Sequence, residues 1–233
     1  MAIPLSEALG SAGLIAAGYV VGGLPLAPAL ARKSGVDPGR ERDLHIALWH
    51  HASKRRASIA AAGDLFKGVI PPAIGYVVAL PAAVAAFSGV AATAGQMWPA
   101  YGGHRGEGGN SVGVGMLLSV SMLYGAYLTL LSLVFFATGA LLRYLCLRSS
   151  DLRRRRADHP MSLCLPLGMF LGFGLAPLFS VWSGVPRGMA WAFAALFLLI
   201  ALRRVLAGGM QGIGRRGPTV LLSRLLFDQD RVG

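Results

Sequence analysis

Residues 113–143 decide the fold, and they read GVGMLLSVSMLYGAYLTLLSLVFFATGALLR, an apolar run of about 31 residues. Because about 20 apolar residues cross a lipid bilayer as a helix, this run is either one long tilted helix or two helices joined by a tight turn near Gly125 to Leu128. The two alternatives place the cationic segment Arg153 to Arg156 on opposite sides of the membrane. The distribution of charge along the chain therefore decides between them.

The whole chain has the composition of a membrane protein. Of its 233 residues, 55% are hydrophobic and 14% are charged, whereas soluble domains carry about a quarter charged residues. The other apolar runs occupy residues 9–31, 59–80, 81–94, 161–181 and 188–202. No polar segment between them is long enough to form a soluble domain. We therefore expect residues 1–233 to form a single integral membrane domain, an all-α bundle of transmembrane helices.

Lysine and arginine collect between the apolar runs. If residues 113–143 cross the membrane twice, the chain has seven spans, and every Lys and Arg except Arg187 falls on one side or at its boundary. If they cross once, Arg153 to Arg156 moves to the opposite side, against the bias that keeps basic residues cytoplasmic. The sequence therefore predicts seven transmembrane helices, with the N-terminus outside and the C-terminus cytoplasmic. The net charge of +12 then belongs to loops that contact anionic lipid headgroups, and we expect no nucleic-acid partner.

Two segments have the pattern of short helices at the membrane surface. In residues 40–56, leucine and isoleucine lie among histidine, tryptophan and basic residues, and VLLSRLLF at residues 220–227 is a shorter version. His50 and His51 are adjacent, so they face different sides of a helix and do not form a chelating pair. No HExxH or Cys/His spacing accompanies them, and we predict no metal site.

The motif GDLFKG, Gly63 to Gly68, places two ionisable residues at the start of the second apolar run. Asp64 and Lys67 are three residues apart, so they share one face of a helix and can pair. An ionisable residue this close to hydrocarbon is costly unless it is paired or solvated, which makes the pair a candidate for a functional site. The alternative is an interfacial lysine whose ammonium group extends to the headgroups.

A second candidate is the glycine-rich segment GQMWPAYGGHRGEGGNS at residues 95–111. Backbone N–H groups in such a segment can surround an anionic oxygen, and an arginine can bind the same anion through two hydrogen bonds. The segment lacks the GKS or GKT ending of a Walker A loop. The alternative is a flexible linker, although a linker has no need of Trp98 and Pro99. The residues of this candidate phosphate site are His104, Arg105, Gly106, Gly108, Gly109, Asn110 and Ser111.

A third candidate is Arg143, which ends the fifth predicted span in LLRYLCLRSS, residues 141–150. Its guanidinium group could reach a phosphate at the cytoplasmic face. A basic residue at the end of a span also anchors the helix at the interface, and the position favours that role.

Taken together, these features resemble the bacterial acyl-phosphate:glycerol-3-phosphate acyltransferase family of the PlsY type, whose members are seven-span enzymes of phospholipid synthesis. The resemblance rests on GGLPLAPALAR at residues 22–32, GDLFKG, GQMWP at residues 95–99, RYLCL at residues 143–147 and RRVLAGG at residues 203–209.

The resemblance implies transfer of a fatty acyl group from acyl phosphate to glycerol 3-phosphate, which yields lysophosphatidic acid, in the inner membrane of a bacterium. The implied partners are these two substrates and membrane lipids. The chemistry requires no metal or cofactor. The enzyme interpretation assigns Lys67, Arg105 and Arg143 to catalysis, and it assigns Asp64 and the remaining residues of the glycine-rich candidate site to substrate binding.

The chain also departs from the family pattern. GRERDLHIALWHHASKRR at residues 39–56 stands where the family has GSGN and GATN segments, and HRGEGG at residues 104–109 replaces FKGGKG. Gln96 replaces a histidine, and Leu198 and Ala201 replace a histidine and an asparagine. These changes favour an alternative function, that of a catalytically inactive relative that binds lipid or a partner protein. A small-solute transporter is a third class, but the sequence has neither inverted repeats nor polar residues at the middle of its spans.

Overall fold

The computed structural model describes residues 4–39, 44–101, 103, 106–148, 164–207 and 217–227. All regular elements within these ranges are helical, as the sequence predicts. In chain order they are α1 (Leu5–Gly22), α2 (Leu26–Arg32), α3 (Leu44–His51), α4 (Lys54–Val77), α5 (Ala82–Met97), α6 (Asn110–Leu123), the 3-10 helix η1 (Tyr127–Leu131), α7 (Ser132–Arg148), α8 (Cys164–Trp182), α9 (Arg187–Ala207) and α10 (Gly217–Phe227).

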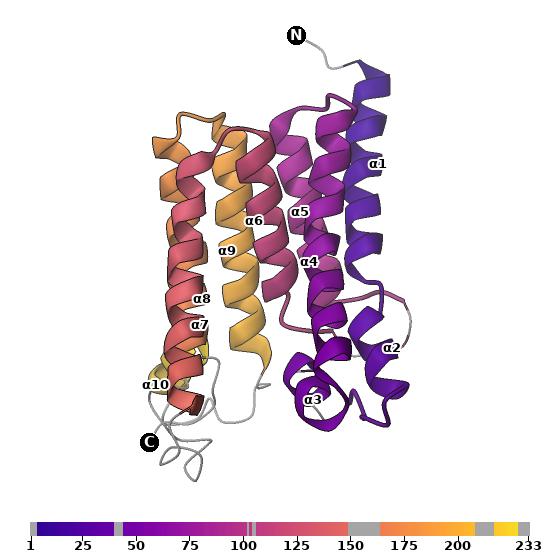
Figure 1. The fold of residues 1–233 in the computed structure, drawn as a ribbon. Coiled ribbons are helices and arrows are strands. Elements are labelled where there is room, and N and C mark those ends of the chain that lie inside the picture. Colours follow the sequence, from indigo (N-terminus) through magenta and orange to yellow (C-terminus); the bar gives the residue numbers. More distant parts are fainter. Residues whose placement is uncertain are drawn as a thin grey trace.

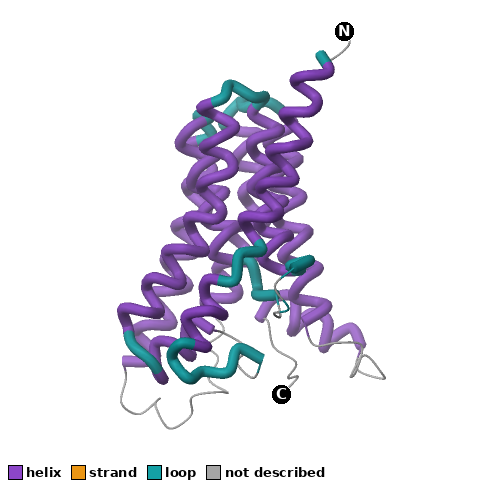
Figure 2. The backbone as a smooth tube through the Cα atoms, turned by 90° about the vertical axis from the view of Figure 1, so that its right-hand side faces the viewer, coloured by secondary structure: helices purple, strands orange, loops and turns teal. Residues whose placement is uncertain are grey.

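The long helices lie side by side in one bundle, while α2, α3 and α10 gather at one of its ends (Figure 1). The view turned by 90° shows the same elongated bundle, with short loops at the opposite end (Figure 2). Helix α5 packs against α1, α4, α6 and α9, and α8 lies between α7 and α9. Four helices are long and apolar enough to cross a membrane, namely Leu5–Arg32, Tyr127–Leu145, Cys164–Trp182 and Arg187–Leu206.

The apolar run at residues 113–143 is broken in two, as predicted. Helix α6 ends at Leu123, and the next helical element begins at Tyr127. Gly125 between them has a left-handed φ of 75°, which glycine adopts at little cost. The turn is closed by Thr129, whose N–H donates to the Ala126 carbonyl over 2.9 Å. The chain therefore reverses direction within the run, and α7 returns along α8 instead of extending α6.

The predicted surface helix at residues 40–56 ends earlier than expected. Helix α3 ends at His51, and α4 begins at Lys54. Ser53 separates them because its hydroxyl accepts a hydrogen bond from the Arg56 N–H over 3.2 Å, which caps the N-terminus of α4. The prediction of one helix through residue 56 is therefore wrong at its C-terminal end, and the basic residues there form the first turn of α4.

Helix α10 matches the second predicted surface helix, and two arginines hold it against the bundle. Arg204 of α9 donates to the Leu225 carbonyl over 3.0 Å and to the Pro166 carbonyl over 3.1 Å. In return, Arg224 of α10 donates to the Val205 carbonyl over 3.4 Å. These bonds satisfy carbonyls near the ends of α9 and α10, where no further helical turn is available to do so.

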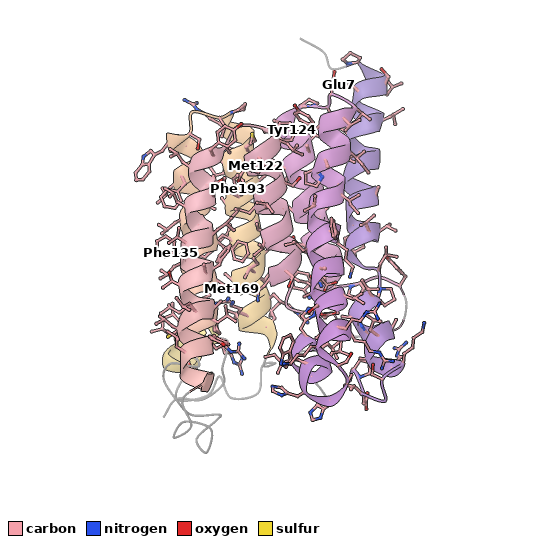
Figure 3. All side chains as sticks on the ribbon, in the orientation of Figure 1. Glu7, Met122, Tyr124, Phe135, Met169 and Phe193 are labelled. Carbon is pink, nitrogen blue, oxygen red and sulfur yellow. The ribbon has the colours of Figure 1, made fainter. Side chains whose placement is uncertain are left out.

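Apolar side chains fill the centre of the bundle and also cover its outer surface. Phe173, Phe193 and Leu196 are buried in the main core, and Phe193 points inward from α9 in Figure 3. On the outside, Trp191 is 68% exposed and Val181 is 61% exposed. A soluble protein of this size seldom exposes so much continuous apolar surface, whereas lipid contact accounts for it.

Glycine allows two helix pairs to approach closely. A Cβ atom at Gly18 of α1 would lie 2.3 Å from the Ser88 carbonyl oxygen of α5, and one at Gly115 of α6 would lie 2.1 Å from the Leu65 carbonyl oxygen of α4. Such approaches replace the hydrophobic driving force that is absent between helices in lipid. The contact at Gly115 also fixes α6 against α4, which carries Asp64 and Lys67.

We predict that Gly18→Ala destabilises the protein and that Gly13→Ala does not. The new methyl group at residue 18 would overlap the α5 backbone, and overpacking of this kind costs about 1–3 kcal/mol. At Gly13, on the same helix, a Cβ atom meets nothing within 4 Å. Thermal unfolding in detergent measures the difference, and a Gly18→Ala variant as stable as Gly13→Ala would contradict the close α1–α5 contact.

Candidate functional site

The polar groups of interest lie at the end of the bundle that also holds α2, α3 and α10 (Figure 1). Helix α4 passes this end near its N-terminus, α5 ends there and α6 begins there, with residues 98–109 running between the last two. The C-terminal end of α9 completes the group. Residues that are far apart in the sequence therefore meet in one region.

Asp64 and Lys67 of α4 form the buried ion pair that the sequence predicts. The Lys67 Nζ atom lies 2.6 Å from Asp64 Oδ1. Asp64 is 0% exposed and Lys67 is 5% exposed, so the lysine does not extend to the headgroups as the alternative would require. Burying either charge without a partner would cost several kcal/mol, which explains why both residues occur together.

His45 of α3 is a further partner of Asp64, and sequence reasoning missed it. Its Nε2 atom lies 3.1 Å from Asp64 Oδ2 and 3.8 Å from Glu107 Oε2. The imidazole therefore connects α3, α4 and the glycine-rich segment. The sequence carries no local signal for this contact, because His45, Asp64 and Glu107 belong to three separate elements.

The same three residues have the donor atoms of a cation site. One ligand atom from each of His45, Asp64 and Glu107 lies within 4.8 Å of the others. However, Lys67 occupies the second oxygen of Asp64, and its ammonium group would repel a divalent cation placed beside that carboxylate. Lys67 already supplies positive charge to the cluster, and the prediction that the site needs no metal stays a prediction.

Arg203 of α9 holds the glycine-rich segment from the other side. Its Nη2 atom donates to the Gly106 carbonyl over 2.6 Å, and its Nε atom donates to the Glu107 carbonyl over 3.3 Å. The guanidinium carbon lies 5.7 Å from the centre of the Trp98 ring, within the range of a cation–π contact. The Glu107 N–H donates to the Gln96 carbonyl over 3.0 Å.

Two tyrosines attach the start of this segment to the end of α1. The Tyr19 hydroxyl donates to the Trp98 carbonyl, and the Tyr101 hydroxyl donates to the Val20 carbonyl. Desolvation, with a smaller contribution from neighbouring Tyr19, raises the pKa of Tyr101 above its usual value. The Tyr101 hydroxyl therefore remains protonated and keeps its role as a donor at neutral pH.

The segment leads into α6 through Gly109, which has a left-handed φ of 72° and stands at the N-cap position. The first intrahelical bond runs from the Gly113 N–H to the Gly109 carbonyl, so the N–H groups of Asn110, Ser111 and Val112 have no helical acceptor. A helix N-terminus of this kind carries partial positive charge and favours a phosphate or carboxylate.

Two buried amide oxygens near this junction have no hydrogen-bond partner within the described part of the chain. They are Oε1 of Gln96, at the end of α5, and Oδ1 of Asn110, at the start of α6. Buried acceptors are nearly always satisfied by protein, water or ligand. A hydroxyl-bearing ligand can therefore contribute the missing donor.

The structure brings together most, but not all, of the residues that the sequence singles out. Asp64 and Lys67 lie at the same end of the bundle as the glycine-rich segment, with Gly106, Gly108, Gly109, Asn110 and Ser111. Arg143 belongs to α7, which packs on α8 across the bundle from α4 (Figure 1). The structure therefore does not bring Arg143 to the Asp64–Lys67 pair. His104 and Arg105 lie outside the described residues.

Comparison with known proteins gives a consistent result. The glycerol-3-phosphate acyltransferase family matches residues 12–207. A glycerol-3-phosphate acyltransferase of Azotobacter vinelandii is 33% identical over 111 residues, which are 44% of this chain and 56% of that protein. Another, from Rubrobacter xylanophilus, also matches over 56% of its length, so the chain spans little more than half of these two relatives. A third, from Halorhodospira halophila, is 26% identical over 88% of this chain and 97% of its own.

The fold has a counterpart among solved structures. It is similar to the crystal structure of PlsY, an integral membrane glycerol 3-phosphate acyltransferase, in its lysophosphatidic acid form, with a TM-score of 0.64 and 20% identity over 85% of this chain and 93% of that one. The shared fold and the four long apolar helices make this chain an integral membrane protein. Because the family match covers most of the sequence and includes Asp64, Lys67, the glycine-rich segment and Arg203, the chain belongs to the glycerol-3-phosphate acyltransferase family.

Proposed function

We propose that this protein transfers a fatty acyl group from acyl phosphate to the 1-hydroxyl of glycerol 3-phosphate in phospholipid synthesis. The observation that carries the proposal is the family match over residues 12–207, because it includes both polar elements of the site. The buried Asp64–Lys67 pair and the α6 N-terminus supply the cationic and amide groups that two phosphate-bearing substrates need.

The reaction asks the protein for positioning and charge stabilisation. The glycerol hydroxyl oxygen attacks the acyl carbonyl carbon, and the bond between that carbon and the phosphate oxygen breaks. Inorganic phosphate leaves and takes up the proton that the hydroxyl loses. Acyl phosphate is a mixed anhydride and needs no further activation, so the reaction requires no nucleophilic side chain, metal or cofactor.

The proposed roles follow the placement of the residues. Arg105 and the N–H groups from Gly106 to Ser111 bind one phosphate, with His104 beside them. Lys67 binds the other, because Asp64 uses one of its three ammonium donors and leaves two for a ligand. Gln96 and Asn110 accept hydrogen bonds from glycerol hydroxyls. Arg143 anchors α7 at the interface and takes no part in catalysis.

We further propose seven membrane crossings by α1, α4, α5, α6, α7, α8 and α9 within the single domain 1–233. The turn at Gly125 supports the additional crossing. The described basic segments near α2 and α3 lie at the same end of the bundle as the ends of α7 and α9 (Figure 1), in keeping with a cytoplasmic face. This topology places the N-terminus outside and the C-terminus in the cytoplasm of a bacterium, with the protein in its inner membrane.

We predict opposite labelling of the two ends of the bundle. On a Cys146→Ser, Cys164→Ser background, a cysteine introduced as Ser183→Cys, in the turn between α8 and α9, is expected to react with a membrane-impermeant maleimide in intact cells with a permeable outer membrane. Lys33→Cys, after α2, is expected to react only after lysis, because its end faces the cytoplasm. Labelling of both variants from the same side would contradict the topology.

We predict that the purified protein in detergent forms lysophosphatidic acid from palmitoyl phosphate and glycerol 3-phosphate, with or without EDTA. Arg105→Ala is expected to lower turnover about a hundredfold or more, because loss of a preorganised donor to developing charge has an effect of this size. Arg187→Ala, at the opposite end of α9, is the matched control and is expected to retain wild-type turnover.

The outcome separates the enzyme from the inactive relative. If the wild-type protein forms no product above a protein-free blank, the chain is instead a lipid-binding or partner-binding subunit. Loss of product on adding EDTA, with recovery on adding a divalent metal, would assign a cation to His45, Asp64 and Glu107.

We predict that the Asp64–Lys67 pair has separable structural and functional roles. Asp64→Asn alone leaves a buried ammonium group without its carboxylate, and breaking a buried pair costs about 3–5 kcal/mol. The double variant Asp64→Asn, Lys67→Gln removes both charges and is expected to recover most of that stability in thermal unfolding. Its turnover is expected to stay at least about a hundredfold below wild type, because the phosphate has lost its cation. A double variant with wild-type turnover would reduce the pair to a structural role.

A further inference from the structure

Arg203 stands outside the groups assigned above, yet it makes the most specific contacts to the glycine-rich segment. It donates to two successive carbonyls, those of Gly106 and Glu107, over 2.6 and 3.3 Å. The guanidinium group also lies over the ring of Trp98, at 5.7 Å. A planar fork that bonds two acceptors and packs on an aromatic ring is a property of arginine that lysine does not share.

The two bonds fix the direction of the peptide units. In a trans peptide, the C=O and the following N–H point to opposite sides of the chain, and the described residues contain no cis peptide bond. The Gly106–Glu107 unit is held at both ends, because its carbonyl accepts from Arg203 and its N–H donates to the Gln96 carbonyl over 3.0 Å. The Glu107–Gly108 unit is held by its carbonyl, which directs the Gly108 N–H away from Arg203.

Glycine-rich backbone needs such an external restraint. Glycine loses more conformational freedom on ordering than any other residue, so an anion-binding arrangement of glycine amides is costly to form at the moment of binding. A restraint that orders the segment beforehand removes that cost from the binding step. Residue 203 is well placed for this role, since the C-terminal end of α9 carries partial negative charge that stabilises a guanidinium group.

The neighbouring contacts make the restraint rigid. Trp98, on which the guanidinium group packs, is itself held through its carbonyl by the Tyr19 hydroxyl of α1. Gly106 lies so close to α5 that a Cβ atom there would be 1.8 Å from the Met97 carbonyl oxygen. Arg203 therefore presses the segment between α9 and α5 and has little room to shift.

We propose that Arg203 is a positioning residue that preorganises the amides of residues 106–109 for a phosphate group without contacting the phosphate. The proposal rests on the phosphate-binding role given to the segment above. It predicts that Arg203 controls the affinity for one substrate and leaves the chemical step largely intact.

The test compares Arg203→Ala, Arg203→Lys and wild type, with Arg187→Ala as the control on the same helix. In kinetics with palmitoyl phosphate and glycerol 3-phosphate, Arg203→Ala is expected to raise the KM for one of the two substrates about tenfold or more, with kcat changed less than about threefold. Arg203→Lys is expected to recover only part of this loss, because one ammonium group cannot hold both carbonyls and pack on Trp98.

Hydrogen exchange provides the readout that is independent of turnover. In Arg203→Ala, the Glu107 amide is expected to exchange faster, while amides in the middle of α1 keep their wild-type rates. In the wild type, inorganic phosphate is expected to slow exchange within residues 106–110, and Arg203→Ala is expected to lose this effect. These measurements need no catalysis, so they test the inference even if the wild-type protein forms no lysophosphatidic acid.

Three outcomes would overturn the inference. The first is an unchanged KM for both substrates in Arg203→Ala, and the second is wild-type exchange at Glu107 in that variant. The third is full recovery of KM by Arg203→Lys, which would mean that residue 203 binds phosphate directly as a simple positive charge. An equal loss of kcat and of thermal stability in Arg203→Lys would also count against it, because that result indicates a purely structural role.

Discussion

The arrangement of this site depends on a buried ion pair. Asp64 is fully buried and lies 2.6 Å from Lys67 and 3.1 Å from His45. A carboxylate in that position is tolerated only because cationic and hydrogen-bonding groups surround it. The requirement works in both directions, since α3 must stay against α4 for His45 to reach Asp64, and Glu107 must stay close for the imidazole to lie between two carboxylates. The ion pair thus connects helix packing to the position of the glycine-rich segment.

Close helix packing makes this cluster possible. Residue 115 of α6 must be glycine-sized for its backbone to approach the Leu65 carbonyl, one residue from Asp64. The same contact sets where α6 begins, and therefore where its unpaired N–H groups lie. In a membrane the helices gain little from hydrophobic association with one another, so backbone proximity and polar contacts define their relative positions. The site is consequently a product of the bundle and not of one mobile loop.

The positions at which this chain departs from the family pattern meet in space. His45 belongs to the segment that replaces the GSGN and GATN motifs, Glu107 to the segment that replaces FKGGKG, and Gln96 stands in place of a histidine. In the structure His45 approaches Glu107, and the Glu107 N–H donates to the Gln96 carbonyl. Scattered loss of function would leave unrelated changes, whereas these form one connected polar network. The arrangement fits a site that has been altered as a unit.

The sequence by itself determined the properties that depend on local pattern. Apolar runs of spanning length predicted the helices, Gly125 predicted the turn within residues 113–143, and the spacing of three residues predicted the Asp64–Lys67 pair on one helix face. It erred where a single capping residue, Ser53, divides one amphipathic segment into two helices.

Only the tertiary structure decided which distant residues share the site. His45, Glu107 and Arg203 carry no local signal, because each contacts groups that are dozens of residues away in the chain. Arg143 shows the converse, since its place at the end of a span resembles that of a site residue, yet α7 lies across the bundle from α4. The physical reason is that helix formation follows from neighbours along the chain, whereas the pairing of buried charges follows from how the helices pack.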